Sequence, residues 1–377
     1  MLLEPIEDQA FLRDTTAKFL ADAAPPQVLR TLRDDEAGFD EAYWRQGVEL
    51  GWTSLLVSEE AGGGSVSGDG LVDLSLIAHE FGAAAAPGPL APNAVVAGAL
   101  ARSGGHDEVV AGVLSGGTLV SWAIDEDAHN VAAMPRLFRF RIEGTELVLD
   151  GTKRLVESAN RSDYLLVTGV TPGGITQVLV ATDAAGIEIR PMHTVDLTRR
   201  FSVVTFNNVR VPLDAVVGSI DTAAEAVKLQ RRQAIVIANA ESVGAMQRAF
   251  DLTLEWTFDR YSFGRSLASY QAIKHRMASM KMWLEASHAI ADDAAAAVAA
   301  DSPRAEKLVR AAAAYIGEYG SELMQECVQF HGGIGVTYEH DLHLYLRRHT
   351  LNRALHGTPA QHRRRVAVEL DLESAVS

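Results

Sequence analysis

The stretch Asp259-Arg-Tyr-Ser-Phe-Gly-Arg-Ser-Leu-Ala-Ser-Tyr-Gln271 interrupts a long helical region and decides how the second half of the chain folds. Before it, residues 222–258 contain almost no helix breakers, and after it a second helical segment runs from about 269 to 300. A third segment covers about 303 to 330 and ends at His331-Gly-Gly-Ile-Gly335, which a final helical piece follows. Four long helices joined by short loops predict a helical bundle.

Upstream of this bundle the sequence pattern changes twice. In residues 116–218, short runs such as Thr118–Ile124 and Phe201–Val211 alternate apolar and polar side chains, which predicts a small β-barrel or β-sandwich. Residues 70–82 repeat apolar side chains at helical spacing, whereas Pro87–Pro92 indicates a loop. We therefore expect an α+β multidomain protein with an N-terminal α-helical domain (1–115), a middle β-barrel or sandwich domain (116–220) and a C-terminal four-helix bundle (221–377).

Composition limits the possible environments and partners of the chain. The net charge of −15 would repel the phosphate backbone of a nucleic acid, so we expect no nucleic-acid partner. The single cysteine, Cys327, cannot form an internal disulfide or a cysteine-based metal site, and it favours a reducing compartment. No apolar run approaches the roughly 18 residues of a membrane span, and the N-terminus lacks a signal-peptide pattern. We expect a cytoplasmic protein without membrane contact and without a metal.

Separate motifs along the chain resemble those of one family, the acyl-CoA dehydrogenases. The stretch 259–275 is similar to the family's Arg-x-x-Phe-Gly…Gln segment, and Gln329–Gly335 is similar to its Gln-x-x-Gly-Gly-x-Gly turn. Thr194–Arg200 and Phe206–Pro212 resemble the end of its β domain, and Glu59–Gly64 resembles its N-terminal glycine loop. The motifs occur in the family's order over nearly the whole chain, so together they are far more specific than any one of them.

The resemblance implies an FAD-dependent oxidoreductase that removes two hydrogens from the α and β carbons of an acyl-CoA thioester. In that reaction a carboxylate takes the α proton, while the β hydrogen leaves as a hydride to flavin N5. The resemblance also implies that one subunit grips the ADP half of the FAD of its neighbour. The implied cofactor-binding residues are Arg260 at the pyrophosphate, Phe263 as an apolar wall, Gln271 as a polar contact, and Gln329 and Gly333 at the turn that admits the adenine side.

The motifs that face the flavin in this family are altered in this chain. The family's Thr-Glu-Pro-x-x-x-Ser-Asp stretch corresponds to Ala123–Asn130, which lacks both hydroxyl groups. Its Trp-Ile-Thr/Ser strand corresponds to Leu155-Val156-Glu157, which has lost the aromatic ring and the hydroxyl group. Because like charges at short range are costly in a dry site, we expect Glu157 to place an uncompensated negative charge near reduced flavin.

The family's catalytic base is missing from both of its usual positions. His356 stands before Gly-Thr where most members have glutamate, and Ala234 stands where a minority carry it on the first bundle helix. The nearest acid, Glu241, is two helical turns away, roughly 10 Å, and we interpret it as a polar helix residue or a partner-subunit contact. His356 is conceivable as a base, but beside the CoA anions we expect it to hold its proton and lose basicity. No catalytic residue is therefore assigned.

These residues are compatible with three functions. In the first, the chain would be a subunit of a hetero-oligomeric α₂β₂ acyl-CoA dehydrogenase, of the kind known in bacterial steroid side-chain and dicarboxylate degradation. Its homologous partner would supply the base and the flavin face. Alternatively, it is a self-sufficient homotetramer with a displaced base, or an oxidase or monooxygenase of the same fold. A third possibility is a non-catalytic paralogue with a structural or regulatory role. The expected partners are an acyl-CoA substrate, a homologous subunit or further copies of this chain, and an electron-transfer flavoprotein.

Overall fold

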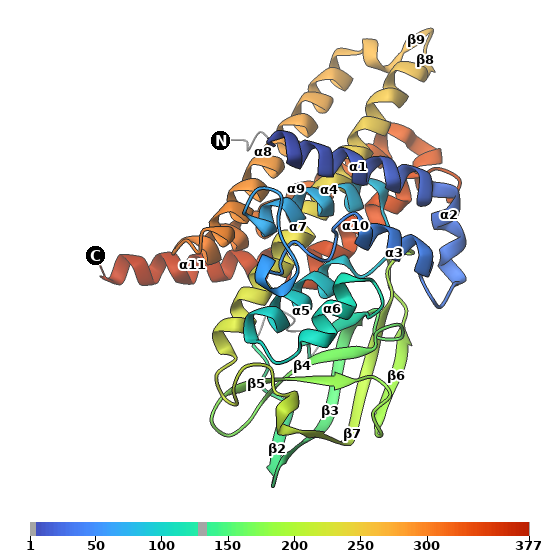
Figure 1. Cartoon of the computed structure of the whole chain (residues 1–377). Helices are drawn as coiled ribbons and strands as arrows, with labels where there is room; N and C mark the ends of the chain where they lie inside the picture. The colour runs from blue at the N-terminus through green and yellow to red at the C-terminus, as the bar shows by residue number, and fades with distance from the viewer. Residues whose placement is uncertain (1–4, 127–133, 377) are drawn as a thin grey trace.

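The computed structural model describes residues 5–126 and 134–376, and its elements run from helices through a sheet to helices again (Figure 1). The side chains of Trp44, Trp52 and Phe81 meet edge to face in the core of the N-terminal helices, with ring centroids 4.7 to 6.0 Å apart. The N-terminal helices are α1 (Glu7–Ala23), α2 (Pro26–Thr31), α3 (Glu41–Glu49), α4 (Gly70–Ala84), α5 (Leu90–Ser103) and α6 (Asp107–Leu114).

The middle of the described chain forms a curled seven-stranded sheet in the order β1-β4-β2-β3-β7-β6, with β5 paired to β4. The strands are β1 (Val120–Ala123), β2 (Arg139–Glu143), β3 (Glu146–Glu157), β4 (Tyr164–Val170), β5 (Ile175–Ala181), β6 (Ile187–Met192) and β7 (Phe201–Pro212). Strands β3 and β7 run antiparallel over their whole length, so that Glu157 lies opposite Phe201. This register brings the last residue of β3 beside the segment that leads into β7.

The C-terminal helices surround one central helix. They are α7 (Ala224–Asp259), α8 (Gln271–Ala299), α9 (Ala305–His331), α10 (Leu342–Leu355) and α11 (Pro359–Val376), and the hairpin β8 (Tyr261–Ser262) and β9 (Arg265–Ser266) joins α7 to α8. Every residue from 233 to 246 of α7 is buried, because this helix packs on α4, α5, α8, α9 and α10. A helix covered on all sides must satisfy its polar residues internally.

Helices α4 and α7 cross with their backbones in contact, and glycine makes this possible. A Cβ atom on Gly82 would lie 1.8 Å from the carbonyl oxygen of Glu241, and one on Gly244 would lie 1.9 Å from that of His79. Neither glycine could carry a side chain without moving a backbone. The crossing therefore fixes Glu241 against the N-terminal helices.

The predicted order of helical, β and helical regions is confirmed, with three local corrections. Strand β6 was not predicted, because only alternate residues are partly covered and Pro191 weakens its strand signal. Pro92, interpreted as part of a loop, lies in the first turn of α5, where proline costs no helical hydrogen bond. The final helical piece is two helices, α10 and α11, which meet at His356.

Candidate functional site

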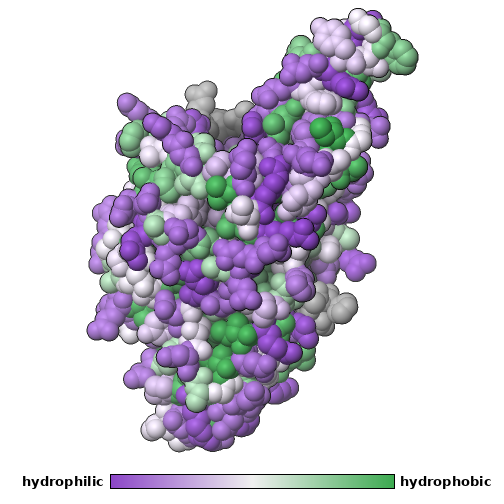
Figure 2. Space-filling view, turned by 90° about the vertical axis from the view of Figure 1, so that its right-hand side faces the viewer, coloured by the Kyte–Doolittle hydropathy of each residue, from purple (hydrophilic) through white to green (hydrophobic). Residues whose placement is uncertain are grey.

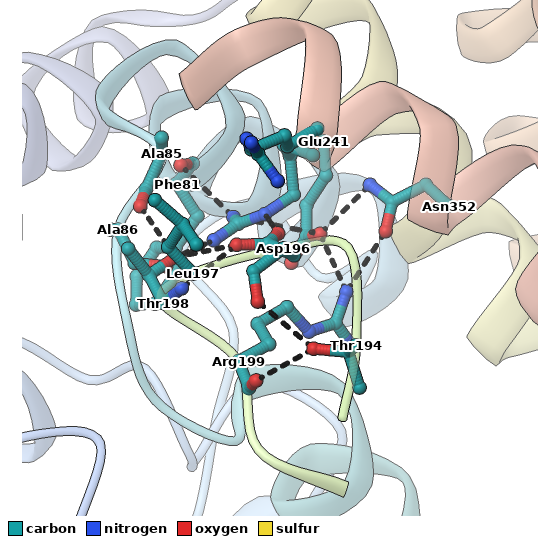
Figure 3. A network of polar contacts seen from close by, with 12 residues as sticks. Phe81, Ala85, Ala86, Thr194, Asp196, Leu197, Thr198, Arg199, Glu241 and Asn352 are labelled. Atoms are coloured by element: carbon teal, nitrogen blue, oxygen red, sulfur yellow. Dashed lines mark hydrogen bonds and ion pairs between the residues drawn. The ribbon is translucent and has the colours of Figure 1, made fainter. Parts of the chain in front are cut away.

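A buried network of charged side chains lies where the N-terminal helices, the sheet and the bundle meet (Figure 3). Arg199, in the segment before β7, holds Glu157 at the end of β3 through two parallel hydrogen bonds, of which Nε to Oε1 is 2.6 Å. Its Nη1 atom donates to Oε2 of Glu241 on α7 at 3.2 Å and to Oδ1 of Asn352 on α10 at 2.9 Å. One guanidinium group thus joins the sheet to two helices.

A second buried arginine ties the same network to the N-terminal helices. Arg348 on α10 is 0% exposed, and its Nε donates to Oδ2 of Asp196 at 2.6 Å. Its Nη2 donates to the carbonyl oxygen of Ala86 and to the hydroxyl oxygen of Thr198, both at 2.7 Å. Asn352 completes the connection, since its Nδ2 donates to Glu241 at 3.0 Å. All three parts of the chain therefore share one ionic network.

The network contains three carboxylates and two guanidinium groups, and burial shifts the pKa values of the carboxylates. Burial raises the pKa of Glu157 above its ordinary value, although Arg199 opposes the shift. Burial would also raise the pKa of Asp196, but Arg348 and the N–H of Thr198 hold it below its ordinary value. Asp196 therefore stays ionised, and Glu157 is the weaker acid of the two.

One expectation about the carboxylates of this region was wrong. Glu157 does not present an uncompensated charge, because Nε and Nη2 of Arg199 bind its two carboxylate oxygens and only 7% of the residue is exposed. Glu241, interpreted as a polar helix residue or a partner contact, is a polar residue of α7 that is 3% exposed and bonds internally to Arg199 and Asn352. Sequence reasoning missed Arg199 because it lies 42 residues from each carboxylate, and no local pattern links them.

The stretch that lacks the flavin-facing hydroxyls contains a second set of buried charges. Arg231 on α7 donates to Asp125 at 3.3 Å, and burial raises the pKa of that carboxyl to about 6. Lys153 is 0% exposed, donates to Ile124 O at 3.0 Å and to Glu126 at 3.1 Å, and burial lowers its pKa to about 8. These side chains are turned towards one another. The rest of the stretch, 127–130, lies outside the described residues.

His356 lies at the end of α10 in surroundings that make it a poor base. It lines a cavity of only about 10 Å³, together with Ala238 and His362, which is room for about one water molecule. Burial, and then the nearby charges of Arg231 and Arg199, lower its pKa to about 3. The expectation that it holds its proton beside CoA anions stays a prediction, whereas the surroundings that this chain itself provides keep the imidazole neutral at pH 7. Its conjugate acid is too strong for the group to draw a proton from carbon efficiently.

No carboxylate stands ready at the alternative position of the base. Ala234 is 2% exposed on α7, and the nearby Glu241 is occupied by Arg199 and Asn352. Cys327 is buried in α9, and burial raises the pKa of its thiol to about 12, so it is chemically inert. Residues 5–126 and 134–376 contain no cluster of three or more His, Cys, Asp or Glu that could hold a metal ion. In the same ranges, no helix is long and apolar enough to cross a membrane.

The five residues expected to grip FAD lie together at the opposite end of the molecule, and we call this group the clasp. All five are exposed, and the β8–β9 hairpin, which carries Phe263, projects from the body of the molecule at the top of Figures 1 and 2. Its members are Arg260 at the end of α7, Phe263 in the β8–β9 turn, Gln271 at the start of α8, Gln329 near the end of α9, and Gly333 just after α9.

A tryptophan holds the two halves of the clasp in place. Trp256 on α7 donates from Nε1 to the carbonyl oxygen of Phe330 at 3.1 Å and stacks on His331 with a centroid separation of 5.2 Å. The guanidinium carbon of Arg260 lies 6.0 Å from the same tryptophan ring, and Arg260 forms no ion pair with any described residue. Phe263 is 98% exposed, which leaves its ring open to another molecule.

The fold and these motifs belong to a class of flavin-dependent dehydrogenases. The model of the acyl-CoA dehydrogenase N-terminal domain matches residues 6–111, and that of the acyl-CoA dehydrogenase C-terminal domain matches residues 228–370. Together these matches cover about two-thirds of the chain. The chain belongs to the acyl-CoA dehydrogenase family, whose members are FAD-dependent oxidoreductases.

Relatives and solved structures match almost the full length. Acyl-CoA dehydrogenase IpdE2 of Mycobacterium tuberculosis is 29% identical, over 98% of this chain and 99% of that protein. A variant of the Tcur3481-Tcur3483 steroid ACAD is 27% identical with a TM-score of 0.87, and the match covers 98% of this chain and 99% of its own. Butyryl-CoA dehydrogenase from Megasphaera elsdenii has the same fold, with a TM-score of 0.89 over 98% of this chain and 100% of its own at 19% identity.

The clasp has groups that suit the ADP half of FAD, whereas the residues expected to face the flavin do not have the hydroxyl groups that the family uses there. The clasp offers an exposed cation in Arg260, an open aromatic ring in Phe263, and a backbone at Gly333 with no atom within 4 Å of where a Cβ would stand. A diphosphate and an adenine ring need such groups. At the flavin-facing end, by contrast, Glu157 and Asp125 are bonded to buried arginines and offer no hydroxyl group.

We predict that Arg199→Met destabilises the fold by about 3–5 kcal/mol, because it leaves Glu157 and Glu241 buried without their cation. Urea unfolding followed by circular dichroism measures the change. Arg210→Met is the matched control, since Arg210 pairs with Glu143 and Glu146 on the exposed face of the sheet, and its loss leaves the free energy of unfolding close to the wild-type value. Equal effects of the two substitutions would contradict the importance given to burial.

Proposed function

We propose that this chain is the base-free subunit of a hetero-oligomeric FAD-dependent acyl-CoA dehydrogenase. In this arrangement a homologous partner supplies the glutamate base and the flavin-facing hydroxyls, and this chain supplies the clasp for the ADP half of FAD. The observation that carries the proposal is the ionic network of Arg199, Glu157 and Glu241, which occupies the flavin-facing end of the chain and leaves no free carboxylate among them. The proposed substrate is an acyl-CoA thioester.

The lack of a working base supports this division of labour. The α proton of a thioester is weakly acidic, so its removal requires a base whose pKa is near the working pH. His356, with its pKa lowered to about 3, is far from that value. Ala234 has no titratable group, and Glu241 is held by Arg199. A base must therefore come from another chain.

The position of the clasp supports an FAD site that is shared between two chains, whether the second is a copy of this chain or a homologue. In Figure 1 the hairpin β8–β9 and the sheet lie at opposite ends of the molecule, so the clasp and the flavin-facing strands of one chain cannot hold one FAD. A neighbouring chain has to provide the flavin face. The relative with two components in its name, the Tcur3481-Tcur3483 steroid ACAD, leads us to propose a partner of the same family and a steroid-type or lipid-type acyl group. The resemblance also leads us to propose an electron-transfer flavoprotein as the electron acceptor.

Purification of the chain alone and with a glutamate-bearing homologue encoded beside it tests the proposal. The chain alone is expected to be colourless and inactive with acyl-CoA substrates, and the co-purified complex is expected to be yellow and active. A yellow and active chain without a partner would instead support a self-sufficient homotetramer. A complex that binds no flavin would support a non-catalytic paralogue.

Replacement of Arg260 by alanine is expected to lower FAD affinity in the active complex by roughly ten- to a hundred-fold, because a charge-assisted contact to the pyrophosphate is lost. Flavin fluorescence after dilution measures the release of FAD. Arg265→Ala is the matched control on the same hairpin, since Arg265 stacks on Tyr270 at 3.8 Å from its ring centroid. Retention of FAD in both variants, with the fold intact, would remove Arg260 from the site.

Replacement of His356 by alanine is expected to leave the dehydrogenation rate of the complex almost unchanged, because the base belongs to the partner. The reduction of flavin by substrate in a stopped-flow instrument measures this step. Conversion of the partner's glutamate to glutamine is the positive control and should slow the step by roughly 10²–10⁴-fold. A loss of that size in His356→Ala would assign the base to this chain.

A further inference from the structure

A cavity of about 730 Å³ lies between the N-terminal helices, the sheet and the bundle. The loop before α4, the end of α5, strand β5 and helices α7 and α8 contribute to its lining. Cavities of this volume accommodate a small molecule of drug-like size. Its apolar wall is formed by Leu55, Leu71, Ala99, Val217, Leu229 and Val298.

This cavity is separate from the surroundings of His356, because the two lie on opposite faces of α7. The cavity is lined by α7 residues 225, 226, 229, 230, 232 and 233, and the space beside His356 by residues 235, 238, 239 and 242. At 3.6 residues per turn, the centres of the two sets lie on roughly opposite sides of the helix, and Arg232 lies at the edge of the first set. A ligand in the cavity would therefore not reach His356.

Groups that favour an anion line the cavity without partners in the described chain. Helix α4 begins there, and its N-cap residue Asp69 makes no side-chain cap bond, so the N–H groups of the first turn lack that acceptor. The charge of Arg232 on α7 acts on Glu225, but among the described residues it forms no salt bridge, and its Nε is buried without a hydrogen bond. Arg102 in the last turn of α5 lines the same space, and no described carboxylate pairs with it.

A buried amide supplies an independent sign of a missing ligand. Gln233 is only 5% exposed, lines the cavity, and its side-chain Oε1 has no hydrogen-bond partner among the described residues. Its neighbours Gln177 and Gln230 satisfy each other instead, with reciprocal amide bonds of 2.8 and 2.9 Å. A buried polar atom without a partner is costly, so the Oε1 atom of Gln233 is placed to accept a hydrogen bond from a donor in the cavity.

The acidic residues of the lining limit the charge of such a ligand. Asp69, Glu225 and Asp301 also face the cavity, and Lys228 neutralises Glu225 at 2.7 Å. Two arginines therefore balance two carboxylates, and the start of α4 adds a partial positive charge. This field suits one negative charge and disfavours a polyanion such as a nucleoside diphosphate.

We propose that this cavity binds a singly charged, largely apolar carboxylic acid. The carboxylate lies between the start of α4 and the guanidinium groups of Arg102 and Arg232, and the apolar body lies on Leu55, Leu229 and their neighbours. An N–H or O–H group on the ligand completes the contact with Gln233. The site lies on the side of α7 that faces away from His356.

Binding of anilinonaphthalene sulfonate, an apolar monoanion whose fluorescence rises on binding, tests the site in the full-length chain. Octanoate should displace the dye, whereas octanol at the same concentration should displace it at least about tenfold less well, because it carries no charge. The absence of dye binding, or equal competition by octanol, would overturn the proposal.

Two pairs of variants locate the dye. Leu229→Trp fills the cavity and should abolish octanoate-sensitive binding, whereas Leu254→Trp, at a separate apolar cavity near the clasp, should leave it unchanged. Arg102→Gln, on an exposed side chain that leaves the fold intact, should weaken octanoate about tenfold, and Arg102→Lys should retain most of the affinity. Loss of binding in Leu254→Trp with full binding in Leu229→Trp and Arg102→Gln would place the dye at the clasp and overturn the proposal.

Discussion

The structure depends on one buried guanidinium group, that of Arg199, which joins the end of β3 to helices α7 and α10. Taking a carboxylate and a guanidinium group out of water is costly, and a network of this kind is tolerated only when each member is held by several partners. Here Glu157 receives two bonds from Arg199, and Glu241 receives bonds from Arg199 and Asn352. Separating these partners would leave unpaired charges in the core. The N-terminal helices, the sheet and the bundle therefore keep a fixed arrangement.

This constraint also explains the separation of roles in the molecule. The region around Glu157 and Asp125 has its charged side chains in internal ion pairs, such as that of Asp125 with Arg231. The clasp end has kept an exposed arginine and an open phenylalanine ring, supported by the stacking of Trp256 on His331. The charged side chains around Glu157 and Asp125 are thus paired within the chain, whereas the clasp exposes its arginine and its phenylalanine ring. In an assembly of this chain with a homologue, the two chains need not contribute equally to a shared site.

Sequence patterns predicted the order of the elements, because helical periodicity and turn residues are local signals. The clasp residues, by contrast, were named from the family resemblance. Sequence patterns did not predict the pairing of Glu157 with Arg199, which depends on the register of β3 with β7 and on the approach of α7. The lowered pKa of His356 was also not predicted. The sequence places arginines and histidines near it but does not reveal that burial outweighs every other influence on its pKa. Strand β6 was not predicted, because it lies at the edge of the sheet and its alternation of apolar and polar side chains is weak.

The ratio of FAD to protein in a complex purified with its partner tests the central claim most directly. If this chain lends only its clasp, each complete site combines that clasp with the flavin face of the partner, and the reciprocal sites stay empty. Flavin absorbance against total protein should then give about one FAD for every two chains. One FAD for every chain, or full occupancy of a tetramer made of this chain alone, would contradict the account.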